Sequence, residues 1–339
     1  MACPSYAIVA LVIHLRVLTA LLCAAAVSSA QSPVLIDTDA GSDDIMAVAL
    51  LLANPSVTID AITVVNGLAH VDAGARNMGR LLNLAGRPRV PVFAGRNTPL
   101  QGDAEFPAEW RRISDELPGV PLPPASRSPQ AKHAADYLSE SLRNPPAPLQ
   151  ILALGPLTNI AEALERDPSI AAHIREIVIM GGAVRVPGNL QDGGVFHTNN
   201  STAEWNIFID PLAARIVFRS GVPIRLIPLD ATNKVHIGPE FLHEFEAKAH
   251  SPLGRVVAGV LKADKETIDA GIFFAWDPLA AAALLRPQIV KTHPMHIDIM
   301  ENAPQKGRTM ATPGPANAQV AIDADVAQFR SFFLQSFAN

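Results

Sequence analysis

The feature that most constrains the fold is an alternation of short apolar segments with helical ones from residue 34 onward. Segment 57–65 is rich in β-branched residues, as strands are, whereas segment 72–85 places its apolar residues on one face at helical spacing. The other predicted strands are 34–36, 90–93, 149–154, 174–180 and 224–228, and the other predicted helices are 44–53, 131–142, 159–166, 211–220, 239–248, 253–266 and 278–285. Such alternation predicts a single α/β domain, Rossmann-like, with a mostly parallel central sheet flanked by helices.

Four carboxylates follow the first predicted strand. Asp37, Asp39, Asp43 and Asp44 lie within eight residues, in the turn that leads to the first predicted helix. Such a turn lies at the carboxyl edge of an open α/β sheet, where ligands bind. The helix dipole explains Asp43 and Asp44 alone but leaves the other two unexplained. Because like charges this close repel unless a cation compensates them, we expect a hard divalent cation with oxygen ligands.

Two other acidic motifs fit these residues less well. A calcium-binding EF-hand loop needs Gly at its sixth position and Glu at its twelfth, but counting from Asp37 these are Ser42 and Val48. A phosphatase with an aspartyl nucleophile resembles Asp-x-Asp-x-Thr/Val after a strand. Gly41 occupies the last position here, which weakens that hypothesis without excluding it.

Two long segments, 96–128 and 187–203, break the alternation. The first is rich in proline and contains Phe106 and Trp110, and the second is polar and rich in Gly and Asn. Loops of this length in a compact domain are usually functional or disordered. Since both leave the carboxyl edge of a predicted strand, we expect them to border one cleft.

Further polar residues lie at the ends of predicted elements. Glu204 and Asn206 share one face if the chain is extended there, and together they suit a polyhydroxylated ligand. Asn199 and Asn200 either join that face or are turn residues. Asp277 precedes a proline, so helix N-capping explains it as well as function does.

The segment from Leu154 to Asn159 ends a predicted strand and opens a helix. Thr158 or Asn159 can cap that helix, and turn chemistry alone explains the segment. The carbonyl of Leu154 is nevertheless expected to point to the same edge of the sheet. Asp210, followed by Pro211, is interpreted as a helix start only.

Residues 1–30 differ from the rest of the 339-residue chain, because they are largely apolar and end in Ser28-Ser29-Ala30. This pattern is typical of a secretory signal peptide cut after Ala30, with 31–339 as the mature domain in the periplasm or outside the cell. No Lys or Arg precedes the apolar run, so a start assigned too early, and a cytoplasmic protein, is the alternative. Both cysteines lie in this leader, which excludes thiol chemistry from the mature chain.

The composition narrows the choice of partners. A net charge of −5 provides no basic surface for nucleic acid. No segment after the leader is long and apolar enough to span a bilayer, so no membrane contact is expected once the leader is cleaved.

Taken together, several segments in one order resemble the nucleoside hydrolase family, also called inosine-uridine preferring nucleoside hydrolases. The resemblance spans nearly the whole mature chain. It rests on segments 37–44 (DTDAGSDD), 61–67 (AITVVNG), 154–161 (LGPLTNIA), 180–182 (MGG), 203–206 (AEWN) and 276–278 (WDP). The resemblance implies hydrolysis of the N-glycosidic bond of a ribonucleoside, and a homo-oligomer, either a dimer or a tetramer.

The resemblance also implies roles for individual residues. A Ca²⁺ ion would be bound by Asp39, Asp44, Asp277 and the carbonyl of Leu154, and would hold the ribose 2′ and 3′ hydroxyls and the attacking water. Asp39 would act as the general base on that water. The remaining substrate contacts would come from Asp43 and Asn206 on the ribose diol, Glu204 and the Met180 backbone on the 5′ hydroxyl, Asn66 on the water or the ribose, and Asn200, with Asn199 and Asn189 as alternatives.

The base preference depends on Trp276. Pyrimidine-accepting members of the family have a histidine immediately before the last metal-binding aspartate, whereas this chain has Trp276. The chain thus resembles the purine-preferring branch, in which an aromatic ring stacks on the base. Phe106 or Trp110 is expected to supply a second ring. Two other functions stay open: an exported protein that binds nucleoside or ribose without turnover, and a metal-dependent phosphatase, which would need a basic phosphate clamp.

Overall fold

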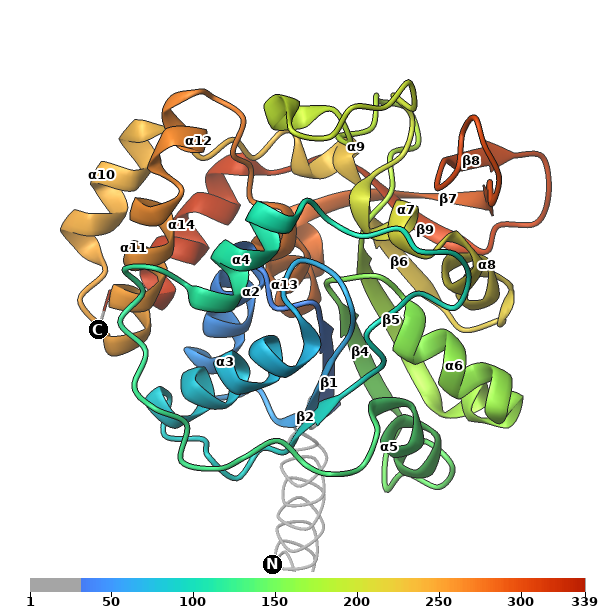
Figure 1. Ribbon diagram of the computed structural model, residues 1–339, viewed down its shortest axis with the longest axis horizontal. Coiled ribbons are helices and arrows are strands. Elements are labelled where there is room, and N and C mark those ends of the chain that lie inside the picture. Colours follow the sequence, from blue (N-terminus) through green and yellow to red (C-terminus); the bar gives the residue numbers. More distant parts are fainter. Residues whose placement is uncertain (1–31, 339) are drawn as a thin grey trace, which may run out of the picture. The chain divides into compact units, whose positions relative to one another are not determined.

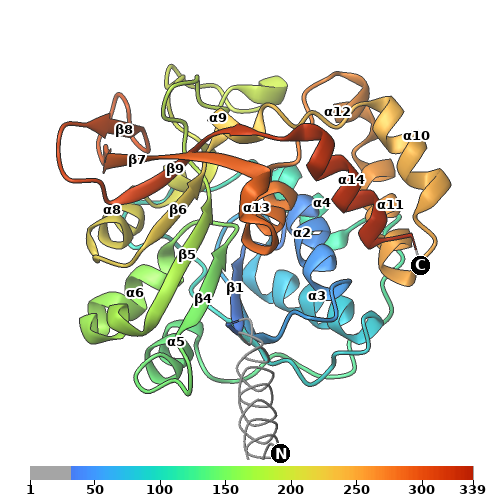
Figure 2. The ribbon, with the colours of Figure 1, turned by 180° about the vertical axis from the view of Figure 1, so that it is seen from behind.

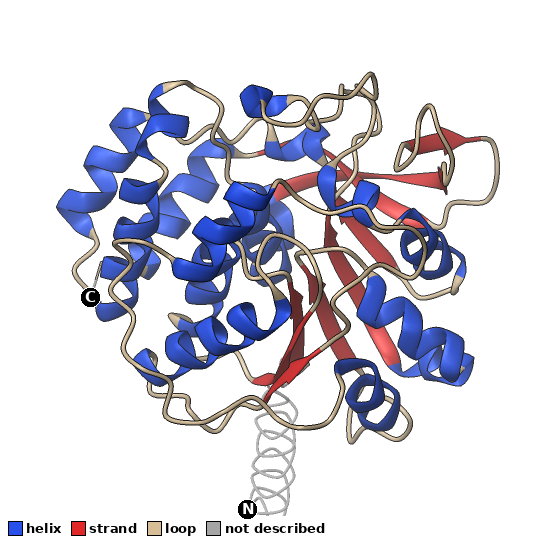
Figure 3. Cartoon of the chain, in the orientation of Figure 1, coloured by secondary structure: helices blue, strands red, loops and turns tan. Residues whose placement is uncertain are grey.

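The computed structural model describes residues 32–338, so the predicted leader lies outside the described residues. A nine-stranded sheet forms its centre, in the order β3-β2-β1-β4-β5-β6-β9-β7-β8 (Figures 1 and 3). The strands are β1 (Val34–Thr38), β2 (Ile59–Val64), β3 (Val92–Ala94), β4 (Leu149–Ala153), β5 (Ile174–Met180), β6 (Ile224–Ile227), β7 (Val290–Ile299), β8 (Thr309–Thr312) and β9 (Ala318–Ala324). All neighbouring pairs from β3 to β9 are parallel, and only β7 runs antiparallel to β9 and β8. The predicted mostly parallel sheet is confirmed.

Helices cover both faces of this sheet. The α-helices are α2 (Ser42–Leu52), α3 (Val71–Leu84), α4 (Ala108–Glu116), α5 (Ala134–Ser141), α6 (Thr158–Arg166), α7 (Trp205–Ile209), α8 (Pro211–Arg219), α9 (Leu229–Thr232), α10 (Pro239–Lys248), α11 (Pro252–Ala263), α12 (Lys265–Asp269), α13 (Trp276–Leu285) and α14 (Val326–Ser336). Helices α2, α3 and α13 lie on one side of the parallel strands, and α5, α6 and α8 lie on the other (Figures 1 and 2). None of these helices is long and apolar enough to cross a membrane.

The apolar run of β1 explains why both faces are covered. Successive side chains of a strand point to opposite faces. Val34 and Ile36 accordingly enter the core beneath α2 and α13, whereas Leu35 enters the core beneath α5 and α6. Helix α2 is buried on all sides from Asp44 to Leu52, because it packs against both α13 and α11. A helix that is apolar all round is stable only in such surroundings.

Several elements differ from the sequence predictions. Helix α4 lies inside the segment 96–128 that was expected to be a loop, and the single helix expected over 253–266 is divided at Asp264 into α11 and α12. The predictions end at residue 285 and therefore miss β7, β8, β9 and α14. Strand β7 exposes Lys291, His293 and Pro294, since it belongs to the antiparallel edge of the sheet rather than to the buried parallel part.

Candidate active site

The turn between β1 and α2 is held by its own side chains. Ala40 has a positive φ of 59°, which costs an L-residue energy, so neighbouring bonds must maintain it. Thr38 Oγ1 accepts a hydrogen bond from the Ala40 N–H at 3.0 Å and donates one to Asp44. The N–H of Gly41 donates to Asp44 Oδ2 at 3.0 Å. The carboxylate of Asp44 is therefore fixed in place before any ligand binds.

Four carboxylates converge at this turn, and we refer to Asp39, Asp43, Asp44 and Asp277 as the carboxylate cluster. Oxygen atoms of Asp43, Asp44 and Asp277 lie within 4.8 Å of one another, and Asp39 hydrogen-bonds to Asp44. Asp277 lies in the first turn of α13, whose N-cap is Ala275, so the N-cap interpretation of Asp277 is wrong. The close packing of α13 on α2 brings Asp277 to the cluster.

Burial and mutual repulsion shift the acid–base equilibria of the cluster. Burial, followed by the charge of Asp44, raises the pKa of Asp39 and of Asp277 well above the ordinary value. The same two causes raise the pKa of Asp43 to about 8. Burial also raises the pKa of Asp44, although hydrogen bonds from Thr38 and its neighbours oppose the shift. A buried cluster of this kind requires protons or a cation to be stable.

The fourth acid of the motif, Asp37, lies apart from the cluster. Its Oδ1 accepts hydrogen bonds from Thr63 Oγ1 at 2.6 Å and from Asn159 Nδ2 at 2.8 Å, and burial raises its pKa to about 7. Asn159 therefore does not cap α6, and Thr158 donates to Asp210 instead, so the capping prediction is wrong for both. Asp210 caps α8, which confirms the helix start predicted there.

Close backbone approaches hold Asp39. Its Oδ2 accepts a hydrogen bond from the Leu68 N–H at 2.9 Å. A Cβ atom at Gly67 would lie 2.0 Å from that oxygen, and one at Gly155 would lie 2.8 Å from the Asp39 Cβ, so only glycine fits at either position. Asn66 lies next to this contact, almost fully buried, and its Oδ1 has no hydrogen-bond partner.

The ends of β4 and β5 supply the remaining predicted residues. Asn206 Nδ2 donates to the Leu154 carbonyl at 3.0 Å and to the Met180 carbonyl at 3.3 Å. The chain is not extended here, because Glu204 is the N-cap of α7 and Asn206 lies in its first turn, so the condition under which the two side chains share a strand face is not met. The carboxylate of Glu204 accepts from the N–H groups of Asn206 and Gly182 at 2.9 and 2.8 Å. Glu204 thus connects α7 to the end of β5.

A cavity of about 560 Å³ opens beside the cluster, a size suited to a small organic ligand. Its lining includes the aromatic wall, which we define as Phe106, Trp110, Trp205 and Trp276. Phe106 stacks on Trp205 with ring centres 4.8 Å apart, and Trp110 meets the edge of Trp205 at 5.6 Å. Both long segments contribute to the lining, as expected, through residues such as Trp110 and Asn189.

The structure separates the candidate asparagines. Asn189 lines the cavity and its Oδ1 accepts a hydrogen bond from the Trp205 N–H at 3.2 Å. Asn200 is not among the lining residues, because its side chain donates to the Lys306 carbonyl at 2.7 Å and accepts from Thr202. Asn199 borders a separate surface cavity. Of the three asparagines, only Asn189 lies where a ligand in the main cavity reaches it.

Several lining residues had no role predicted from the sequence. Ser42 and Asp264 line the cavity and hydrogen-bond to each other, and Trp205 lines it as well. Asp264 belongs to no motif, since it lies near the end of the segment 253–266 that was predicted to be one helix. The break between α11 and α12 falls at Asp264, which lines the cavity.

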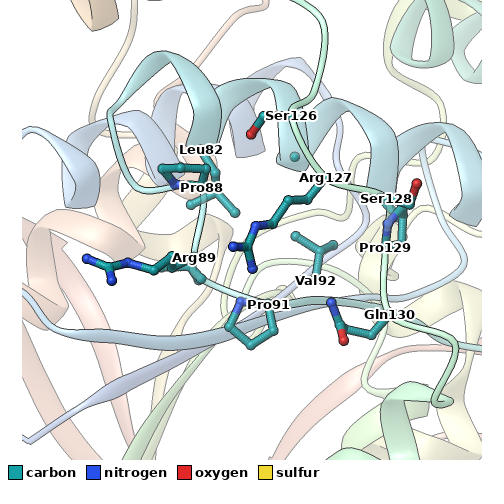
Figure 4. A pocket seen from close by; sticks show the side chains of 13 residues that line it. Leu82, Pro88, Arg89, Pro91, Val92, Ser126, Arg127, Ser128, Pro129 and Gln130 are labelled. Carbon is teal, nitrogen blue, oxygen red and sulfur yellow. The ribbon is translucent and has the colours of Figure 1, made fainter.

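A second cavity, drawn in Figure 4, is of a different kind. It lies where the chain enters β3, at the opposite edge of the sheet from the carboxylate cluster. Its volume is about 20 Å³, and its charged lining residues are Arg89 and Arg127. A space of this size holds no nucleoside.

The fold and the site define the class of protein: an α/β protein with a mostly parallel sheet and a buried carboxylate cluster at the carboxyl edge of that sheet. A family model described as "Inosine-uridine preferring nucleoside hydrolase" matches residues 34–331, and the chain belongs to this family. It is a ribonucleoside hydrolase, an N-glycosidase.

Relatives differ in the base they prefer. A pyrimidine-specific ribonucleoside hydrolase of Citrobacter koseri is 35% identical, over 86% of this chain and 94% of its own. A purine-preferring ribonucleoside hydrolase from Gardnerella vaginalis is 29% identical, with a TM-score of 0.77, covering 90% of this chain and 98% of its own. A plant nucleoside hydrolase has a TM-score of 0.81 at 29% identity, covering 91% and 99%.

Proposed function

We propose that this enzyme hydrolyses purine ribonucleosides to ribose and free base with Ca²⁺ bound at the carboxylate cluster. Proteins of this family bind a metal, and the described residues fit a hard divalent ion. Asp44 and Asp277 provide carboxylate oxygens within 4.8 Å of each other, and Asp39 hydrogen-bonds to Asp44. Carboxylate and carbonyl oxygens are the ligands that Ca²⁺ prefers, and the Leu154 carbonyl borders the same cavity. When bound, the ion would lower the pKa of a water molecule and offset the repulsion within the cluster.

Residues of the chain carry the remaining steps. Asp39, fixed by the Leu68 N–H, takes the proton from the attacking water. Asp43, Asn206 and Glu204 all line the cavity; in this proposal the first two bind the ribose diol and Glu204 binds the 5′ hydroxyl. The carboxylates around the sugar stabilise the positive charge that develops on it as the N-glycosidic bond breaks.

The preference for purines rests on the aromatic lining. Trp276 borders the cavity directly before Asp277. Its ring makes a T-shaped contact with Phe273 at 5.5 Å and a tilted contact with Phe274 at 5.8 Å, measured between ring centres. A held indole ring provides a flat apolar face for a base, and stacking on a bicyclic purine covers more area than stacking on a pyrimidine. Trp110 and Phe106 line the same cavity and are both available as the second ring.

The test is a Ca²⁺-supplemented assay for free ribose with inosine, guanosine, uridine and cytidine. We expect the largest kcat/KM for a purine nucleoside. In Trp276→Ala, purine turnover should fall about tenfold, since base stacking on an aromatic ring is worth on the order of 1–3 kcal/mol. Uridine hydrolysed with a kcat/KM equal to or above that of inosine contradicts the purine preference. Release of no ribose from any of the four, despite a folded protein, contradicts the proposed function itself.

A further inference from the structure

The charges that line the cavity have one sign. Among the described residues that line it there is no Lys, Arg, His or Tyr. Its acidic residues are Asp39, Asp43, Asp44, Asp192, Glu204, Asp264, Glu266 and Asp277. A phosphate clamp of the kind that a phosphatase needs is thus missing from this lining. The same composition leaves no basic side chain to donate a proton to a departing base.

Three of these acids have no role in the proposed hydrolysis. Asp192, Asp264 and Glu266 form no ion pair with any described residue, whereas Glu204 is engaged by backbone N–H groups. Asp264 is the most enclosed of the three. Its side chain hydrogen-bonds to Ser42, and its Oδ2 is buried without any hydrogen-bond partner. A buried carboxylate oxygen beside a cavity and without a partner requires a donor or a positive charge from a ligand.

The aromatic wall points to the same kind of ligand. The face of an aromatic ring is negative, and it attracts a cation placed over it, most strongly for Trp. Trp110, Trp205 and Trp276 all line the cavity that Asp264 borders. Since aromatic faces and unpaired carboxylates favour the same charge, their preferences reinforce each other.

We propose that this enzyme prefers ribonucleosides whose base carries a positive charge, such as N-methylated purine cations, and that Asp264 is the residue that selects them. The proposal rests on the proposed function and adds the substrate class. Asp264 hydrogen-bonds to Ser42, at the start of α2 beside Asp43, and lines the same cavity as Trp276, so a cationic base stacked on Trp276 would share the cavity with this carboxylate.

The chemistry of a cationic base suits a site without a basic proton donor. Water oxygen forms the new bond to the ribose C1′, and its proton passes to Asp39. The C1′–N bond breaks, and its electron pair stays on the base nitrogen. The cationic base thereby leaves as a neutral molecule and needs no proton, whereas a neutral base would leave as an anion unless it were protonated.

Two isomeric substrates test the proposal. N1-methyladenosine is a cation at neutral pH and N6-methyladenosine is neutral, so they differ in charge and in the position of one methyl group. The ratio of their kcat/KM values is measured with Ca²⁺ for the full chain, for Asp264→Asn, and for Glu240→Gln as a control. Glu240 is an exposed acid of α10 that does not line the cavity.

In the wild-type enzyme we expect a higher kcat/KM for N1-methyladenosine, the cation, than for N6-methyladenosine. Asp264→Asn should lower the ratio about tenfold, and it should change kcat/KM for N6-methyladenosine less than twofold. Glu266→Gln, at a more exposed position, should lower the ratio less, and Glu240→Gln should leave it unchanged. Added salt should weaken only the reaction of the cation.

The outcomes separate the two proposals. If inosine is hydrolysed but the ratio is the same in wild type and Asp264→Asn, the selection by charge is wrong and the proposed function stands. If wild type favours the neutral isomer, the selection is also wrong. If no nucleoside releases ribose, both proposals fail. Circular dichroism of Asp264→Asn shows whether the variant is folded, and Glu266→Gln provides an independent reading if it is not.

Discussion

The carboxylate cluster and the aromatic wall border one cavity but are built differently. Asp39, Asp44 and Asp277 are at most 2% exposed and lie on or beside a strand end or a helix start in the centre of the sheet. The wall is formed by Phe106, in the segment before α4, by Trp110 of α4, by Trp205 of α7 and by Trp276 of α13, and the lining around it includes Val195 and Ile272, which are 51% and 37% exposed. The carboxylate cluster, at the reacting end of the cavity, is thus part of the core. Much of the aromatic wall, at the base-binding end, is carried on loops and short helices.

This difference indicates how substitutions in the carboxylate cluster and in the aromatic wall affect the enzyme. Replacing a residue of the cluster disturbs oxygens that fix one another through Thr38, Gly41 and Leu68. Residues of the wall make few such bonds, so substitutions there can alter the preferred base without affecting the reaction. Relatives that share the fold and differ in base preference are consistent with this division.

The largest effect is expected at the cluster, in Asp39→Asn. The amide cannot accept the proton of the water, and it is a weaker metal ligand, so kcat should fall about a thousandfold or more. The melting temperature should stay the same or rise, because one buried charge is removed. The measurement is ribose release from inosine, with circular dichroism to confirm the fold.

Asp72→Asn is a suitable control, since Asp72 is an exposed acid of α3 outside the main cavity. It should keep wild-type turnover. Near-normal turnover in Asp39→Asn would remove Asp39 from the mechanism and would weaken the contrast between the two ends.

A second effect concerns the stability of the metal-free protein. Burial raises the pKa of Asp43 from 3.8 to about 8 and that of Asp37 to about 7. A carboxyl whose pKa is raised by folding stabilises the fold below its unfolded pKa, and this contribution is lost as pH rises through the folded pKa. With chelator present, the melting temperature should therefore fall between about pH 4 and pH 8, by roughly 5 °C or more.

Added Ca²⁺ should reverse this loss, and its stabilising effect should be larger at pH 8 than at pH 5 because the metal competes with protons for the same oxygens. The comparison requires thermal melts at matched ionic strength, with Mg²⁺ as a second ion. A metal-free protein that becomes more stable over the same interval would show that the cluster does not hold unpaired charge.

Much of the core of the site could be predicted from the sequence. The apolar run before Asp39 and the apolar helix after Asp44 place both residues at a strand-to-helix turn, and the structure has them there. The contribution of Asp277 could not be predicted from local sequence, because an acid before Pro278 is equally typical of an N-cap. Assigning Asp277 to the cluster required either the resemblance to a family or the observed packing of α13 on α2.

Residues on irregular backbone were harder to predict. Asp264 lies where α11 ends and α12 begins, and no pattern in the segment 253–266 marks the break. The assignment of Asn200 came from the resemblance to the family, with Asn199 and Asn189 as alternatives in the same Gly- and Asn-rich loop. The side chain of Asn200 contacts a distant partner, the Lys306 carbonyl. A loop held by distant partners cannot be traced from its own residues.

The smallest expected effects separate Asn189 from Asn200. Asn189→Ala should lower kcat/KM for inosine severalfold without a large change in melting temperature, since its side chain borders the cavity and accepts one hydrogen bond, from the Trp205 N–H. Asn200→Ala should leave KM unchanged but destabilise the fold by about 1–3 kcal/mol, because the Lys306 carbonyl loses its donor and Thr202 loses its acceptor. Steady-state kinetics and urea unfolding of both variants measure the two quantities. If instead Asn200→Ala raises KM while Asn189→Ala does not, the loop must rearrange on binding to present Asn200 to the ribose, and the cavity lining observed here is not that of the complex.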